Sequence, residues 1–322
     1  MPVIDTTNWQ TIAWQGITLR VPPEWNIGAI GGDREQGYMR IDSPEMPRVE
    51  VKWQHSPGFV NVSDVVDKYI AELKRKPRKG EPEVVAERDI DLVSKRKMRK
   101  SSLTCFRWQA DTTGHGAGWY CERCERMMLV QVMATRHEDG EALAQEIITN
   151  LEDHPREGWT RWATYGLDTA VLDRFELTEQ KLMAGLIELH FKSEGEELVV
   201  ARWGMANVIL KSREMAAWAR AELPKRHKGV KLSCEDAQVR GHPAVAITGE
   251  QVSPISRAQV FVMHCLRKPF AEAVVGRVWH CEDDNKLFYV GGLLDRDNVG
   301  LLDEIIGNTP CHEPEQRGSG RR

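Results

Sequence analysis

Hydrophobic and polar side chains alternate in two separate stretches of the chain. In residues 48–53 the apolar positions are Val49, Val51 and Trp53, and charged residues occupy the positions between them. Residues 187–191 alternate in the same way. A period of two is typical of a β-strand that buries one face, so both stretches are predicted to be strands.

A helical period follows the first predicted strand. Its apolar positions are Val62, Val65, Val66, Tyr69, Ile70 and Leu73. Their spacing of three and four residues predicts an amphipathic helix. A second helix is expected from about Ser212, and closing helices are expected after Asp139 and Asp297, because serine and aspartate are favoured N-cap residues.

Runs rich in β-branched and aromatic residues predict further strands. These runs are residues 103–109, 127–133, 244–251, 258–265 and 286–290. The predicted order is strands, one helix, a meander of strands and a closing helix, and this order occurs twice. It favours an α+β fold in which helices pack on an antiparallel sheet.

The repeated order coincides with an internal duplication of the sequence. The matched segments are 9–16 with 159–166 and 49–53 with 199–203 at a shift of 150, 105–107 with 265–267 and 119–122 with 279–282 at a shift of 160, and 146–150 with 304–308 at a shift of 158. Three similar shifts in one order predict two tandem α+β copies, residues 1–155 and 156–309. A polar linker is expected at 153–158, and a disordered tail is expected over 310–322.

A short motif near the start of the chain adds a resemblance to a known fold. Pro23-Glu24-Trp25 follows an early predicted strand, and Gly241-His242-Pro243-Ala244 precedes a later one. Together with the order of elements, these features resemble the PsbP-like fold, which includes photosystem II extrinsic subunits, bacterial lipoproteins and a Ran-binding nuclear import factor. The resemblance implies an accessory or binding module rather than an enzyme. The second copy departs from it, with Asp173-Arg174-Phe175 in place of Pro-x-Trp.

Composition narrows the class of protein further. The 322 residues are 41% hydrophobic and 29% charged, an ordinary globular mixture, and the net charge of −4 is too small to indicate a nucleic acid or membrane partner for the whole chain. No apolar run approaches the roughly 20 residues of a membrane span. The N-terminus lacks a secretory pattern, and seven cysteines do not indicate a disulfide scaffold. We therefore expect a cytoplasmic protein with reduced thiols.

Cysteines supply the most specific candidate chemistry. Both copies contain Cys-x-Arg followed by Trp-x-Cys-Glu, which places Cys105 sixteen positions before Cys121 and Cys265 sixteen positions before Cys281. If the intervening segment is a hairpin, the two cysteines of a copy are expected to lie near each other on adjacent strands.

Three interpretations of these cysteines stay open. Free cysteine is often buried beside tryptophan as a small hydrophobic residue. Alternatively, Cys105, Cys121, Cys265 and Cys281 share a structural zinc site between the copies, or part of this set recruits Cys124 and His280. A third interpretation is a redox pair, in which Arg107 or Arg267 lowers the pKa of a nearby thiol.

Two clusters of cations suggest a different kind of site. One occupies residues 74–79, and the other consists of Lys95, Arg96, Lys97, Arg99 and Lys100. Such clusters bind phosphate backbones, but cations after a helix also complement its dipole, and five acidic residues lie between the two clusters. A solvated loop is the simpler interpretation, and a nucleic acid partner is not favoured.

The sequence contains no Walker A, Gly-x-Gly-x-x-Gly, His-Glu-x-x-His or Gly-x-Ser-x-Gly motif. We therefore predict a non-enzymatic accessory or adaptor protein that binds another protein through paired α+β domains and carries no cofactor. The alternatives are a thiolate-based zinc or redox protein that uses cysteines of both copies, and a protein that binds an anionic polymer through its basic loops.

Overall fold

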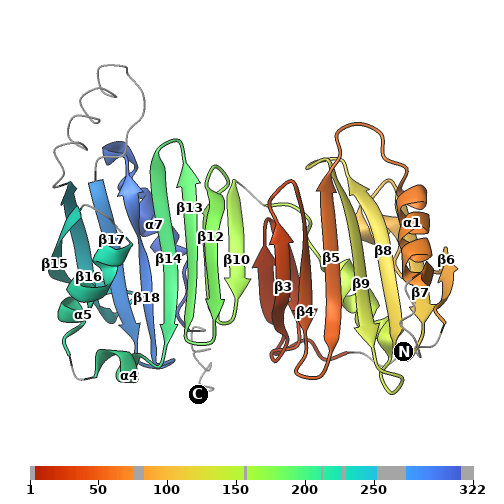
Figure 1. The fold of residues 1–322 in the computed structure, drawn as a ribbon, viewed down its shortest axis with the longest axis horizontal. Helices are drawn as coiled ribbons and strands as arrows, with labels where there is room; N and C mark the ends of the chain where they lie inside the picture. Colours follow the sequence, from red (N-terminus) through yellow and green to blue (C-terminus); the bar gives the residue numbers. More distant parts are fainter. Residues whose placement is uncertain are drawn as a thin grey trace, which may run out of the picture. The chain divides into compact units, whose positions relative to one another are not determined.

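The computed structural model describes residues 4–75, 83–155, 158–211, 213–226, 230–251 and 273–312 (Figure 1). Its contacts divide the chain into two compact units, Met1–Tyr165 and Gly166–Arg322. This division falls after the predicted boundary at residue 155, because β10 (Trp159–Thr164) pairs antiparallel with β1 (Gln10–Trp14) in the first unit.

Antiparallel strands form the main sheet of the first unit. In spatial order they are β3 (Asn26–Gly32), β4 (Gln36–Asp42), β5 (Pro47–His55), β9 (Arg126–Ala134), β8 (Thr113–Cys121), β7 (Leu103–Gln109) and β6 (Val85–Arg88). The predicted strands at 48–53, 103–109 and 127–133 are therefore confirmed as parts of β5, β7 and β9.

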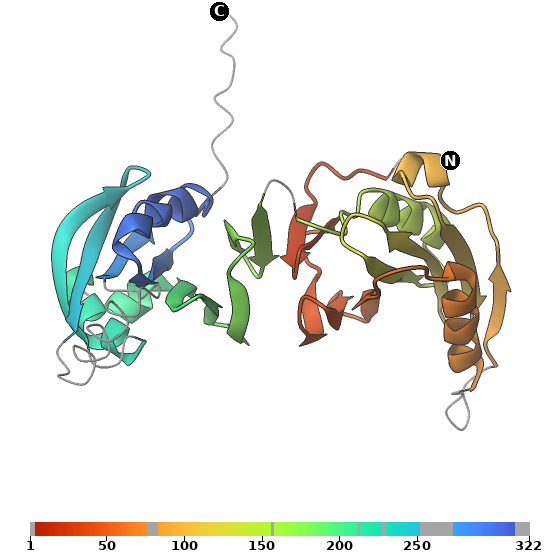
Figure 2. The ribbon, with the colours of Figure 1, turned by 90° about the horizontal axis from the view of Figure 1, so that it is seen from above.

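Helices cover both faces of this sheet, as Figure 2 shows. On one face, Val66, Tyr69 and Ile70 of α1 (Val62–Arg75) pack against Phe106 and Leu129. The helix approaches closely because β8 has Gly118 there, where an added Cβ would lie 2.7 Å from Val66. The helical period predicted for residues 62–73 is thus confirmed.

The other face of the sheet packs against α3 (Gly140–Thr149). The helix buries Ile147 and Ile148, and Asp139 caps it by accepting a hydrogen bond of 3.0 Å from the backbone N–H of Ala142. The predicted N-cap is therefore confirmed. β2 (Ile17–Val21) pairs with β1 and also contacts α3, and α2 (Lys95–Met98) is a single turn before β7.

The second unit repeats the strand order of the first. Its main sheet runs β12 (Glu176–Met183), β13 (Leu186–Ser193), β14 (Glu196–Gly204), β18 (Lys286–Leu294), β17 (Ala273–Cys281), β16 (His242–Gln251) and β15 (Val230–Val239). The predicted strands at 187–191, 244–251 and 286–290 lie inside β13, β16 and β18. Both units are thus mostly antiparallel sheet with a few helices, as an α+β fold requires, whereas the duplication as its origin stays a prediction.

Smaller elements complete the second unit. They are β11 (Leu167–Leu172), α4 (Ala206–Leu210), α5 (Met215–Glu222), η1 (Leu223–Lys225), η2 (Arg296–Asn298) and α7 (Leu301–Gly307). On one face Trp218 of α5 stacks edge-on against Trp203, with ring centroids 5.1 Å apart. α7 contacts β11 and β18.

The strand register corrects the predicted match between residues 49–53 and 199–203. β9 and β18 match at the shift of 160, so Leu287 corresponds to Met127. Trp203 pairs with Leu287, but Trp53 pairs with Met128. The two tryptophans therefore do not occupy the same position. The shift between β5 and β14 is therefore 149. Because a slip of one residue exchanges the faces of a strand, Trp203 faces α5, and Trp53 faces away from α1.

Three predicted ends also need correction. Asp297 does not cap α7, because it lies within η2 and the helix begins after Gly300. Cys311 is buried and His312 is partly buried, so these two residues belong to the second unit and not to a tail. The helix expected from about Ser212 begins at Met215, with Glu214 and not Ser212 at its N-cap position. Ser212, the strand predicted at 258–265 and residues 313–322 lie outside the described residues. Within the described part of the chain, none of the helices combines the length and apolar character needed to cross a membrane.

Candidate functional sites

The register of β7 separates two of the candidate cysteines. Cys105 pairs with Ala117, and its Sγ lies 3.8 Å from the carbonyl oxygen of Val93. The same register, continued beyond the strand, places Ser101 rather than Cys105 opposite Cys121. The expectation that Cys105 and Cys121 are neighbours is therefore wrong in the first unit. Cys265 lies outside the described residues. The predicted match of 105–107 with 265–267 is wrong, because the strand registers place Ala246 of β16 at the position of Cys105.

Cys121 instead belongs to a cluster formed within the first unit. The first-unit cluster consists of Cys121 at the end of β8, Cys124 in the turn to β9, and His154 in the segment after α3. The Cys121 Sγ lies 3.4 Å from Nδ1 of His154. The Cys124 Sγ donates to the backbone carbonyl of Asp153 across 3.6 Å.

A buried ion pair adjoins the first-unit cluster. The Asp153 carboxylate accepts hydrogen bonds from Nζ of Lys100 and Nε1 of Trp119, both at 2.6 Å. It also lies 2.8 Å from Nδ1 of His154. Burial by itself would raise the pKa of Asp153, but these hydrogen bonds outweigh it and lower that pKa. Asp153 is therefore a buried carboxylate with a lysine ammonium as its counterion.

The same surroundings act on the thiols. A hydrogen bond from Cys124 and the positive charge of Lys100 lower the pKa of the Cys121 thiol, although its burial raises it. Lys100 thus supplies positive charge both to Asp153 and to Cys121. An ammonium group in this position opposes the entry of a second cation, so the first-unit cluster resembles an ionic network more than a metal site.

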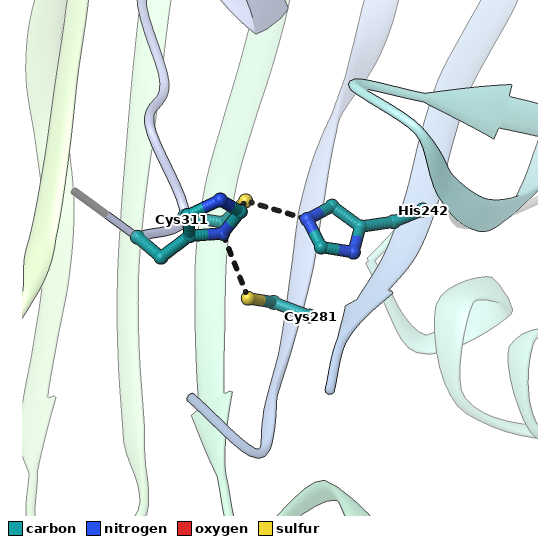
Figure 3. A group of neighbouring side chains, drawn as sticks. His242, Cys281 and Cys311 are labelled. Carbon is teal, nitrogen blue, oxygen red and sulfur yellow. Dashed lines mark hydrogen bonds between the residues drawn. The ribbon is translucent and has the colours of Figure 1, made fainter. Parts of the chain in front are cut away.

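Cys281 lies in a larger cluster, within the second unit. The second-unit cluster consists of His242, Cys281, Cys311 and His312, whose ligand atoms all lie within 4.8 Å of one another. His242, Cys281 and Cys311 point toward one another in Figure 3. Nδ1 of His312 is 3.3 Å from the Cys281 Sγ and 3.4 Å from the Cys311 Sγ. Nε2 of His242 is 3.4 Å from the Cys311 Sγ.

Sequence reasoning missed four members of these clusters. His242, Cys311, His154 and His312 are far from the Trp-x-Cys-Glu motif along the chain. One signal could have found two of them: the shift of 158 that matches 146–150 with 304–308 also matches His154 with His312. The recurrence of a histidine at that shift, just beyond each closing helix, indicates a common position in the two copies. The same shift matches Asp153 with Cys311.

Four of the five predicted anion-binding residues surround one pocket. Lys95, Arg96, Arg99 and Lys100 line a space of about 600 Å³ that also contacts Arg123, Cys121 and His154. Lys97 is not among the lining residues. The charge of Lys100 is already paired with Asp153. Glu122 also lines this pocket, but Lys95, Arg96, Arg99 and Arg123 outnumber it, so the pocket is positively charged.

An apolar groove opens beside α1, on the part of the sheet formed by β3, β4 and β5. We define the apolar groove by its lining residues, which are Gly31, Gly32, Gln36, Gly37, Tyr38, Lys52, Trp53, Gln54, Val65, Met127 and Leu129. Its volume is about 450 Å³. The Tyr38 ring covers Gly31, where an added Cβ would lie 2.4 Å from the ring, and Tyr38 stays 45% exposed.

The corresponding groove of the second unit is charged. Its space of about 820 Å³ is lined by residues of β13, β14 and α5 and includes Glu188. Glu188 is almost fully buried and accepts hydrogen bonds from Nζ of Lys181 at 2.9 Å and Nε of Arg226 at 2.7 Å. His190 Nε2 lies 2.8 Å from the same carboxylate. Burial would raise the pKa of Glu188, but His190, Lys181 and Arg226 lower it to about 2.

The sequence matches no protein-family model and no curated protein. Among solved structures, a chain of the Tle4–Tli4 complex is 11% identical, with a TM-score of 0.37, over 96% of this chain and 99% of that chain. The apo structure of the immunity protein TplEi of T6SS from Pseudomonas aeruginosa is also 11% identical, with a TM-score of 0.37, over 95% and 97% of the two chains. The structure of TplEi complexed with "L" peptide is 9% identical, with a TM-score of 0.33 and coverages of 95% and 99%. The PsbP-like resemblance stays a prediction.

Proposed function

We propose that this protein is a non-enzymatic module that binds a protein partner through the apolar groove of the first unit. The observation that carries the proposal is the exposure of large apolar side chains at this groove. Tyr38 lies in the groove, and Phe59, which is 96% exposed, lies in the loop between β5 and α1. Gln54 of β5 and Val65 of α1 line the groove, so the loop that carries Phe59 joins two elements that line it.

The energetics favour burial of these side chains by a partner. Covering a phenylalanine side chain contributes about 2 kcal/mol relative to leaving it in water, and aromatic residues dominate the binding energy of many interfaces. The Tyr38 ring lies over Gly31 of the groove and stays partly exposed, so this ring offers an apolar surface that a side chain of the partner can cover. Lys52 adds a cation to the groove. The partner should therefore present an apolar side chain with a carboxylate nearby.

Site-specific photo-crosslinking in the source cell tests the proposal. A photo-reactive amino acid at position 38 should yield a discrete adduct, and mass spectrometry identifies the protein that is attached. The matched control is position 85, because Val85 is also an exposed apolar residue, 70% accessible, but lies on β6 at the far edge of the sheet. Equal adducts at both positions, or none at position 38, would contradict the proposal.

Binding by the purified partner provides the quantitative test. Phe59→Ala and Tyr38→Ala should each weaken the complex by about 5- to 30-fold, because each removes an aromatic side chain worth about 1–2 kcal/mol at an interface. Val85→Ala should leave the affinity unchanged. The outcome against the proposal is an affinity that none of the three substitutions alters.

A second candidate function, binding of an anionic polymer, is favoured by one observation. Lys95, Arg96 and Arg99 line the same pocket without an acidic partner at hydrogen-bond distance among the described contacts. If they bind phosphates, retention on immobilised DNA or RNA should fall as salt rises. Neutralising these three residues should abolish retention, whereas neutralising the exposed Lys68 of α1 should not. Retention that is equal in both variants excludes this function.

A further inference from the structure

The second-unit cluster has the dimensions of a metal coordination sphere. Zinc binds thiolate sulfur at about 2.3 Å and imidazole nitrogen at about 2.0 Å, so two ligands at the corners of a tetrahedron lie about 3.6 Å apart. Three sulfur–nitrogen separations are 3.3, 3.4 and 3.4 Å, and the other pairs of ligand atoms lie within 4.8 Å of one another. Side-chain movements of about an ångström or less therefore suffice to place one ion among the four ligands.

Three parts of the second unit supply the ligands. His242 begins β16 and Cys281 ends the adjacent strand β17, so the sheet fixes these two residues relative to each other. Cys311 and His312 follow α7. The Cys281 and Cys311 side chains are buried, while the two imidazoles are only partly covered. Ligands fixed by strands and closed by a short segment are typical of structural sites.

A buried indole N–H marks the place where the second unit lacks the carboxylate of Asp153. In the first unit Trp119 Nε1 donates to Asp153, but Cys311 occupies the position that matches Asp153, and Nε1 of the equivalent Trp279 is buried with no hydrogen-bond partner among the described residues. An unsatisfied buried N–H costs about 1–3 kcal/mol. A compensating gain is needed if the carboxylate is replaced by a thiol, and metal ligation supplies one.

The second unit lacks the positive charge that Lys100 supplies in the first unit. Leu103 pairs with Trp119, and Ala244 pairs with Trp279, so the two registers match Lys100 with Gly241. The ammonium that neutralises Asp153 in the first unit therefore has glycine as its counterpart. A divalent cation would occupy the equivalent place among two thiolates.

We propose that His242, Cys281, Cys311 and His312 bind one zinc ion in a closed, four-coordinate structural site of the second unit. Tetrahedral sites of two thiolates and two imidazoles select zinc among common divalent ions. Zinc displaces the two thiol protons, and its two positive charges balance the two thiolates. Because the protein supplies all four ligands, no position stays open for water or substrate, which makes the site structural rather than catalytic. The ion joins the segment after α7 to β16 and β17.

Elemental analysis of the full chain tests the site directly. Protein purified with zinc in the medium and passed over a desalting column should retain one equivalent of zinc. Cys281→Ser and Cys311→Ser should each reduce this to near zero. Cys121→Ser and Cys105→Ser are the matched controls, because both thiols are buried in the other unit, and these variants should retain the full equivalent.

Cobalt substitution distinguishes loss of ligands from loss of fold. The wild-type protein loaded with Co²⁺ alone should show thiolate-to-cobalt charge transfer and the intense visible bands of a tetrahedral site. His312→Cys, which keeps four ligands, should retain binding and strengthen the charge-transfer band, with unchanged circular dichroism. Wild-type protein that retains less than about a tenth of an equivalent of zinc and shows no cobalt bands overturns the proposal. Zinc retention that depends on Cys121 and not on Cys281 overturns it as well.

Discussion

The two units have the same strand order but different chemistry at the same place, where the end of the β8 or β17 strand meets the segment after the closing helix. In the first unit Lys100 and Asp153 form a buried ion pair there. In the second unit Gly241 and Cys311 occupy the matching positions, and two histidines join the cysteines. Both arrangements place a cation between a sheet and the segment that follows a helix, so one fold tolerates a lysine or, as we propose, a zinc ion in this role.

The groove beside α1 in the first unit and the groove beside α5 in the second differ as sharply. Tyr38 pairs with Lys52, which pairs with Leu129, while Glu188 pairs with Ala201, which pairs with Tyr289. Since Leu129 and Tyr289 are related by the shift of 160, an exposed aromatic ring in one unit corresponds to a buried carboxylate in the other. Similar sheets can therefore present an apolar surface in one unit and a charged one in the other.

Removal of metal should produce the largest difference in stability between the two units. A structural ion present at about 1,000 times its dissociation constant contributes about 4 kcal/mol to the free energy of unfolding. Treatment with a chelator should therefore lower the stability of the second unit by at least this amount. The readout is alkylation of Cys281 and Cys311 against denaturant, followed by mass spectrometry, with Cys105 and Cys121 as reporters of the first unit.

Two outcomes of the chelator experiment are informative. Protection of Cys105 and Cys121 should not change, since Lys100 replaces the ion in the first unit. Equal loss of protection at all four thiols would contradict the difference between the units, and so would no loss at any of them.

The next largest effect is expected from Lys100→Met. This substitution leaves the Asp153 carboxylate, only 4% exposed, without its counterion, and breaking a buried ion pair by removing one partner costs about 3–5 kcal/mol. Denaturant unfolding monitored in the first unit measures the loss. Lys97→Met is the matched control, because Lys97 lies in α2, three residues before Lys100, and is exposed. Similar midpoints for the two variants would show that the ion pair does not stabilise the unit.

Acid should act on the charged groove of the second unit. The pKa of Glu188 is lowered to about 2 by Lys181, His190 and Arg226, and Glu222 is the other acidic group that contacts Arg226. Because the folded pKa lies below the unfolded value of about 4.5, the stabilisation is present above pH 4.5 and is lost as the pH falls toward 2. Its size is about 3 kcal/mol at neutral pH.

The variant Glu188→Gln isolates this contribution. Its stability should fall below that of the wild type at pH 7, and the difference should shrink between pH 4.5 and 3. Both proteins keep the same proposed zinc ligands, so any acid loss of metal cancels in the comparison. Parallel pH profiles would contradict the assignment to Glu188.

The smallest effect on stability is expected at the apolar groove. Phe59→Ala removes a side chain that is almost fully exposed, so the free energy of unfolding should change by less than about 0.5 kcal/mol. Thermal or denaturant unfolding measures this change. A loss of 2 kcal/mol or more would show that Phe59 packs within the unit, which would remove it from the proposed interface.

Local sequence patterns predicted many helices and strands correctly, but they did not predict which residues form the two cysteine clusters. The apolar period of residues 62–73, the strand at 103–109 and the cap at Asp139 depend on neighbours in the chain, and each is confirmed. The match of Trp53 with Trp203 was wrong because similar apolar runs fit a strand in two registers, and only pairing with β9 and β18 selects one. Cys105 was misplaced because the turn between β7 and β8 is centred on residue 111, which pairs Cys105 with Ala117.

The sequence by itself determined where strands and helices alternate along the chain and where Trp-x-Cys-Glu recurs. It also provides enough thiols to bind a metal or to form a redox pair. Tertiary structure decided which cysteine and histidine side chains lie close together. Cys281, His242 and Cys311 are separated by 39, 30 and 69 positions, so no local pattern relates them, and they converge because β16 pairs with β17 and α7 returns the chain to the end of these strands. Propensity is a property of neighbouring residues, whereas a coordination sphere is a property of the register and packing that bring distant residues within a few ångströms.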